Sequence, residues 1–178
     1  MSGHSHWAGI KHKKALTDAK RANVFTKFGC LVTIAAREGG GNPDANFKLK
    51  LAIDQARSVN MPKENIERAI KRGTGELKDQ AAIEEIVYEA FGPGGIMMII
   101  KTLTDNKNRT VSEIKTILGK FGGKLGGPGS VMWNFEMSGS ELKPKSIMEI
   151  NEEIKAQYEK LLEALDNQDD IQEIYDNL

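Results

Sequence analysis

The chain has 178 residues, of which 39% are hydrophobic and 28% charged, a composition that is typical of a folded domain and excludes a disordered one. The formal net charge is zero, but residues 1–75 carry 14 Lys and Arg against 6 Asp and Glu, whereas residues 76–178 carry 11 against 19. The single cysteine, Cys30, excludes an internal disulfide and a cysteine-based zinc cluster. Because the chain shows neither an apolar leader nor an apolar run near the ~20 residues that cross a bilayer, we expect a cytoplasmic protein without membrane contact.

The first 27 residues are basic and polar. They hold all three histidines, one of the two tryptophans and six cations against one acid, Asp18. A segment with so little apolar content favours contact with a polyanion, although a solvated chain end has the same composition. Trp7 suits either stacking on an unpaired base or anchoring the segment to the protein. The residues that we expect to bind nucleic acid here are Trp7, Lys11, His12, Lys13, Lys14, Lys20, Arg21 and Lys27.

The N-terminal spacing also fits a metal. If Met1 is removed, the chain begins Ser-Gly-His, and its amine, two backbone nitrogens and the imidazole of His4 can bind Cu(II) or Ni(II) in a square plane. Since this capture needs nothing but the spacing, we expect it to be incidental. The sequence therefore predicts no functional metal and no cofactor.

Three helices are predicted in a first domain, residues 1–75. The first begins at Thr17 or Asp18 and ends at the glycines 39–41, the second opens at 42–44, and the third spans 62–73. Cys30 lies beside the apolar stripe of the first helix, which indicates a packed thiol.

The periodicity changes in a second domain, residues 76–178. Strands are predicted at 83–91, 96–104, 130–136 and 141–150, with a helix through 111–121 and a last helix through 154–165. The order ββαββα predicts an α+β fold, a two-layer, ferredoxin-like sandwich that follows the three-helix domain.

The sequence offers little for catalysis. No histidine lies beyond position 12, and the glycine clusters at 92–95 and 122–129 are typical of turns rather than phosphate cradles. We therefore expect no enzyme. Lys107 and Arg109 open the helix after residue 106, where free backbone N–H groups favour an anion, so they form a second candidate site; the alternative is ordinary capping by Asn108.

Several long motifs carry a family resemblance. They are GHSHWAGIKHKKALTDAKRANVFTK, AAREGGGNPDAN, IERAIKRGTGE, YEAFGPGGIMMII, LTDNKNRTVSEIK and GGKLGGPGSVMWNFE. In this order they resemble the YebC/PmpR family, which includes the mitochondrial translational activator of cytochrome c oxidase subunit I. The resemblance implies an N-terminal helical domain followed by α/β domains. It also implies a regulator that binds DNA or acts on translation at the ribosome.

The chain departs from the family pattern in length. Family members have a third domain inserted within the second, and this piece is missing near residues 137–141. Three functions follow from the sequence: a DNA-binding transcriptional regulator, a translation factor that binds ribosomal RNA, and a protein adaptor that uses the acidic half. The predicted first helix lacks a cluster of base-reading Arg, Asn and Gln, which favours irregular RNA over sequence-specific DNA.

Overall fold

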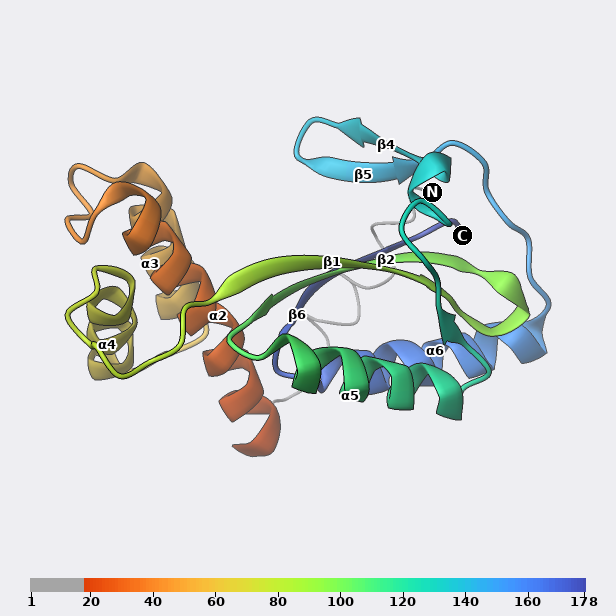
Figure 1. The fold of residues 1–178 in the computed structure, drawn as a ribbon, viewed down its shortest axis with the longest axis horizontal. Coiled ribbons are helices and arrows are strands. Elements are labelled where there is room, and N and C mark those ends of the chain that lie inside the picture. Colours follow the sequence, from red (N-terminus) through yellow and green to blue (C-terminus); the bar gives the residue numbers. More distant parts are fainter. Residues whose placement is uncertain (1–17) are drawn as a thin grey trace. The chain divides into compact units, whose positions relative to one another are not determined.

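The computed structural model describes residues 18–178 (Figure 1). These residues divide into two compact units, residues 18–84 and residues 85–178. The first unit is helical, and the second combines antiparallel strands with two long helices.

The helical unit contains α2 (Asp18–Gly39), α3 (Phe47–Ser58) and α4 (Lys63–Gly73). Helix α2 contacts both α3 and α4. The unit buries Val32 of α2, Leu49 and Ala56 of α3, and Ile66 of α4. The three predicted helices are thus confirmed, with the first ending at the predicted glycines and the third beginning after Pro62.

The predicted start of the second helix is wrong by several residues. Asn42 does not cap a helix but accepts the N–H of Asp44 in a turn, and α3 begins only at Phe47. The cap is Asn46, whose Oδ1 accepts the N–H of Leu49 at 3.1 Å. Its Nδ2 donates to the carbonyl oxygens of Ala35 and Gly40, at 2.8 and 2.9 Å. Asn46 is buried because it ties the end of α2 to the start of α3.

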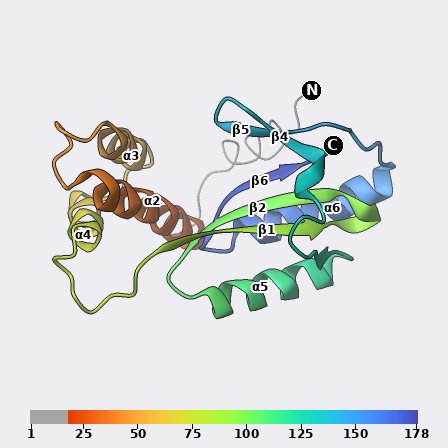
Figure 2. The same cartoon turned by 45° about the horizontal axis from the view of Figure 1, so that its top comes forward.

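The second unit is built on a four-stranded sheet with the order β3-β1-β2-β6. The strands are β1 (Glu84–Phe91), β2 (Met97–Thr104), β3 (Lys124–Leu125) and β6 (Ile171–Asp176). Helices α5 (Lys107–Lys120) and α6 (Glu152–Asp166) cover one face (Figures 1 and 2). The hairpin of β4 (Phe135–Ser138) and β5 (Glu141–Pro144) lies over the other face.

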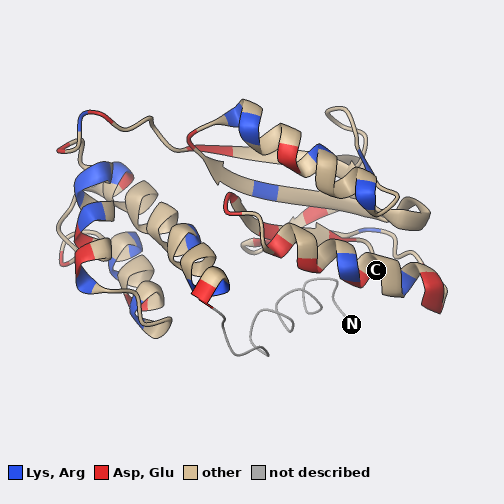
Figure 3. Cartoon of the chain, turned by 90° about the horizontal axis from the view of Figure 1, so that it is seen from below, with Lys and Arg blue, Asp and Glu red and all other residues tan. Residues whose placement is uncertain are grey.

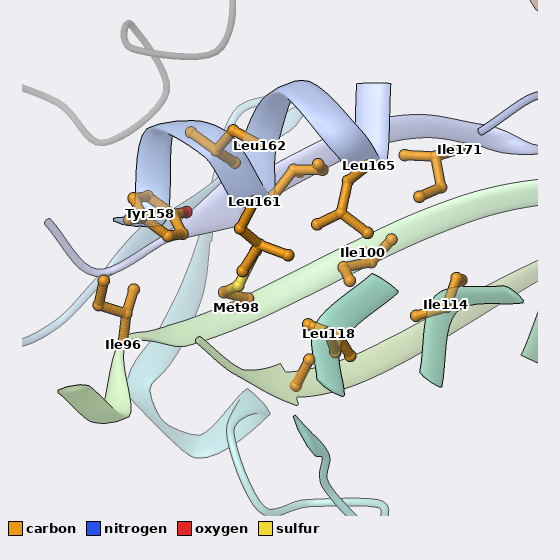
Figure 4. Packing of buried hydrophobic residues seen from close by; sticks show 12 residues of the cluster. Ile96, Met98, Ile100, Ile114, Leu118, Tyr158, Leu161, Leu162, Leu165 and Ile171 are labelled. Atoms are coloured by element: carbon orange, nitrogen blue, oxygen red, sulfur yellow. The ribbon is translucent and has the colours of Figure 1, made fainter. Parts of the chain in front are cut away.

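Each face of the sheet has its own core. Ile100 of β2, Ile114 and Leu118 of α5, and Leu161 and Leu165 of α6 point toward one another and are fully buried (Figure 4). On the other face Ile99, also fully buried, packs with residues of the hairpin. Strand β2 is therefore a central strand with buried apolar residues on both faces.

The α+β class is confirmed, but the strand assignments need correction. The predicted strand 130–136 begins as the short 3-10 helix Met132–Asn134, and only then does β4 follow. The final strand, β6, was not predicted, although it occupies an edge of the sheet beside β2. Strands β1 and β2 are joined by the three-residue 3-10 helix Pro93–Gly95 and not by an α-helix, so the order is not the βαββαβ order of a ferredoxin-like domain.

The place where the family insertion is expected forms a tight turn here. Ser138 and Glu141 are paired across the end of the β4–β5 hairpin, and Gly139 between them has a φ of 68°. The two strands are thus connected directly by the chain.

Candidate nucleic-acid interface

Most of the predicted N-terminal site lies outside the described residues. This applies to Trp7, Lys11, His12, Lys13 and Lys14, and to His4 of the metal hypothesis. Within residues 18–178, no group of three His, Cys, Asp or Glu side chains gathers to hold a metal ion. None of the helices in that range is long and apolar enough to cross a membrane.

The predicted cations of α2 have different environments. Arg21 is exposed, with Nη1 3.5 Å from Asp18, and Lys20 is half-buried. Lys27 is only 3% exposed, so its predicted role as a phosphate contact is wrong for this conformation. The reason is its helical position, because Lys27 shares a face with the packed residues Leu31 and Ala35.

The second predicted site, at the start of α5, is also corrected. Nη2 of Arg109 donates to both carboxylate oxygens of Asp170, at 2.9 and 3.0 Å, and this hydrogen-bonded pairing raises the pKa of Arg109. Asp170 is 5% exposed and also accepts the hydroxyl of Thr110 at 2.7 Å. Arg109 therefore balances a buried carboxylate of its own chain, which competes with any external phosphate for its guanidinium, although 44% of the side chain is exposed.

The helix start itself is capped internally. Oδ1 of Asn106 accepts the N–H of Arg109 at 3.1 Å, so Asn106 and not Asn108 is the cap. Lys107 is exposed at this end of α5. Since Asn106 already satisfies one of the free N–H groups, the arrangement is that of an ordinary helix start.

The second glycine cluster is a turn held by an internal anion. The carboxylate of Glu89 on β1 accepts the N–H groups of Gly129, Val131 and Met132 at 2.6 to 2.7 Å. Partial burial raises the pKa of Glu89, but these three donors lower it by more, so it lies below the ordinary value. The backbone cradle that a phosphate would need is occupied by the protein's own carboxylate.

Replacement of Glu89 by glutamine is expected to lower the free energy of unfolding by about 1–2 kcal/mol near neutral pH, because one amide oxygen cannot accept all three N–H groups. Since the pKa of Glu89 is depressed in the folded state, its contribution is present above the unfolded pKa and is lost as the pH falls through the folded value. Urea unfolding at neutral and acidic pH should show the stability difference between the two proteins shrinking once the pH falls below the unfolded value of about 4.3. A difference that persists in acid would contradict the assignment.

The described residues contain one arrangement that the sequence reasoning missed, a groove between α2 and α4. Its volume is about 430 Å³. Asn65, Arg68 and Arg72 line it from α4, and Gln80 from the loop that follows. The α2 side consists mostly of small residues together with Phe25. Asn65, Arg68 and Arg72 are spaced by three and four residues, which places them on one face of α4. This spacing is the feature of the sequence from which the polar side of the groove could have been predicted.

The lining of this α2–α4 groove is cationic. It contains two arginines and neither Asp nor Glu. Nη2 of Arg72 donates to the carbonyl oxygen of Ala81 at 2.8 Å, which positions its guanidinium. No hydrogen bond or ion pair to another described residue engages the Arg68 guanidinium. The groove therefore presents charge to an anion without an internal competitor at Arg68.

Charge is distributed unequally between the two units. Residues 18–84 carry 12 Lys and Arg against 9 Asp and Glu, and residues 85–178 carry 10 against 16. Lys and Arg recur on all three helices of the first unit (Figure 3). The predicted charge asymmetry thus persists among the described residues, with the basic excess on the unit that contains the groove.

Comparison with known proteins covers both units. A family model described as the TACO1/YebC protein N-terminal domain matches residues 5–76, and a model described as the TACO1/YebC second and third domain matches residues 83–140. A solved structure of similar fold, "Crystal Structure of a Conserved Hypothetical Protein Aq1575 from Aquifex Aeolicus", has a TM-score of 0.85 and 35% identity. The similarity covers 97% of this chain and 96% of that one.

Close sequence relatives carry a common description. The chain is 52% identical to a "Probable transcriptional regulatory protein" of Chlorobaculum parvum, over 96% of this chain and 67% of the relative. It is 50% identical to a protein of the same description from Petrotoga mobilis, over 98% and 69% of the two chains. This chain thus spans about two thirds of their length. These matches confirm the predicted family: the chain belongs to the TACO1/YebC family.

Proposed function

We propose that this chain is a nucleic-acid-binding regulator of gene expression, acting by binding and not by catalysis, and that DNA is its first candidate target. The observation that carries the proposal is the α2–α4 groove, which two arginines line without an acid. The basic excess of the helical unit supports it, as do the relatives described as probable transcriptional regulatory proteins. Phosphate neutralisation by such cations supplies most non-specific affinity for nucleic acid.

The second candidate is a translation factor that binds ribosomal RNA. The composition of the groove favours it, because an apolar wall with Phe25 suits an unpaired base, and unpaired bases are common in structured RNA. Major-groove readout of DNA would require a helix that presents several base-reading side chains. The exposed residues at the start of α2, Asp18, Ala19, Arg21 and Ala22, offer one such side chain, Arg21.

Crosslinking in cells, followed by sequencing of the bound DNA and RNA, distinguishes the two targets when combined with ribosome co-sedimentation. A transcriptional regulator is expected to be enriched on promoter DNA without ribosomal RNA, and a translation factor to show the reverse. If neither DNA nor RNA is crosslinked, the proposal is contradicted, and the remaining candidate function is that of a protein adaptor.

Charge reversal tests whether the predicted basic residues at the N-terminal end of the chain contact nucleic acid. Replacing Lys13, Lys14 and Arg21 by glutamate is expected to weaken binding strongly in low salt, because each cation lost removes a phosphate contact. Fluorescence anisotropy with labelled DNA and RNA measures the change. Unchanged affinity in the triple variant would place the contact elsewhere.

A further inference from the structure

The α2–α4 groove combines two kinds of lining that a simple phosphate site does not need. Arg68 and Arg72 are cationic and planar, and guanidinium groups bind phosphate oxygens bidentately. Beside them, Ala22, Phe25 and Ala69 give an apolar wall. A hydrated phosphate would gain nothing from that wall, whereas the flat face of a base would gain contact area with an aromatic ring.

The α2–α4 groove also contains polar groups that can form hydrogen bonds with the edge of a base. The side-chain amide of Asn65 offers both donors and an acceptor, and it lines the groove from the same face of α4 as Arg68. The hydroxyl of Thr26 lies on the α2 side but donates to the carbonyl oxygen of Ala22 at 3.1 Å. The volume of about 430 Å³ falls in the range of sites that hold a small organic group.

A glycine within α2 supports occupation of the groove. Gly29 lies inside the helix, where glycine is unfavourable relative to alanine, and it lines the groove. A Cβ atom built at Gly29 meets nothing within 4 Å, so packing in the described structure does not require a glycine there. Packing therefore does not explain Gly29. Close approach of a ligand in the groove to the backbone of α2 would explain it, because a side chain at this position would occupy that space.

We propose that the α2–α4 groove takes one unpaired nucleotide of a bound nucleic acid, with the base against Phe25 and the adjoining phosphates on Arg68 and Arg72. The inference rests on the proposed function and adds to it that the strand must be unpaired at this point. A base within a duplex is stacked and cannot enter.

The single cysteine gives a direct probe, because Cys30 lines the groove and is half-buried. The full chain is treated with a maleimide alone, with a short single-stranded RNA or DNA, and with the same sequences annealed to their complements. Bound single strands are expected to slow the labelling of Cys30, while bound duplex leaves it unchanged. Equal labelling with bound single strand and bound duplex overturns the inference but leaves the proposed function standing. If fluorescence anisotropy detects binding of neither single-stranded nor duplex nucleic acid, both this inference and the proposed function are contradicted.

A matched pair of glycine variants separates binding from folding. Gly29→Ala and Gly119→Ala each add one methyl to a helix at a position with nothing within 4 Å, but Gly119 lies in α5. Both are expected to raise Tm. Only Gly29→Ala is expected to weaken single-strand affinity, by about tenfold, because its methyl occupies the path of the base. Equal single-strand affinities of the two variants would contradict the proposal.

Discussion

Replacing Arg109 by methionine is expected to lower the free energy of unfolding by about 2–3 kcal/mol. The change leaves the carboxylate of Asp170, which is 5% exposed, without its cationic partner. Breaking a buried ion pair costs roughly 3–5 kcal/mol, and the loss here is smaller because 44% of the Arg109 side chain is exposed and screened by solvent. Thr110 and Gln168 still donate to Asp170, which limits the loss further.

A double-mutant cycle with Asp170→Asn tests the origin of this effect. Because the neutral amide needs no cation, the Arg109 substitution should cost much less in the Asp170→Asn background. Urea unfolding of the four proteins measures the coupling, and anisotropy measures nucleic-acid binding of each folded variant. A methionine variant of unchanged stability that loses nucleic-acid binding would instead restore the phosphate role predicted from the sequence.

Replacing Gly73 by alanine is expected to destabilise the helical unit by about 1–3 kcal/mol. A Cβ at Gly73 would collide with the backbone carbonyl oxygen of Thr33 and lie 2.8 Å from Cβ of Ala36, so α4 would have to move away from α2. The hydroxyl of Thr33 donates to the carbonyl oxygen of Ala69 at 3.1 Å, and this buried bond would be strained by the shift. Thermal unfolding should show a lower Tm.

A glycine-to-alanine substitution is expected to raise stability at another helical position, Gly119. Gly119 is also helical, but nothing lies within 4 Å of its added methyl, so alanine there should raise Tm through helix propensity. If Gly73→Ala and Gly119→Ala changed stability in the same direction, close approach of α2 and α4 at Gly73 would not be the reason for that glycine.

Local signals predicted the end of α2 and the start of α4, although not the start of α3. Gly39 ends α2, Pro62 precedes α4, and the glycines at 92–95 form the turn between β1 and β2, because capping and turn formation depend on neighbouring residues. Strand β6 gave no such signal. Its residues follow the acidic run Asp169–Asp170, and its place in the sheet depends on pairing with β2, about seventy residues earlier in the chain.

The candidate site was harder to predict because partners distant in sequence decide which cations are available. The sequence predicts Arg109 as a phosphate ligand, but its guanidinium is hydrogen-bonded to Asp170, 61 positions away. Lys27 is predicted from the sequence to bind nucleic acid, yet its side chain is buried. Arg68 and Arg72 lie within the predicted third helix, 62–73, and only the packing of α2 against α4 shows that they line a groove.

The salt dependence of nucleic-acid binding tests the central claim most directly. For the wild-type chain, the logarithm of affinity should fall linearly with the logarithm of salt concentration. Arg68→Glu should lower the affinity and reduce the slope by about 1, whereas Lys160→Glu on α6 makes the same charge change in the acidic unit and should leave the slope unchanged. A salt-independent affinity, or equal slopes for the Arg68 variant and the wild type, would contradict the assignment of the helical unit and its groove to nucleic-acid binding.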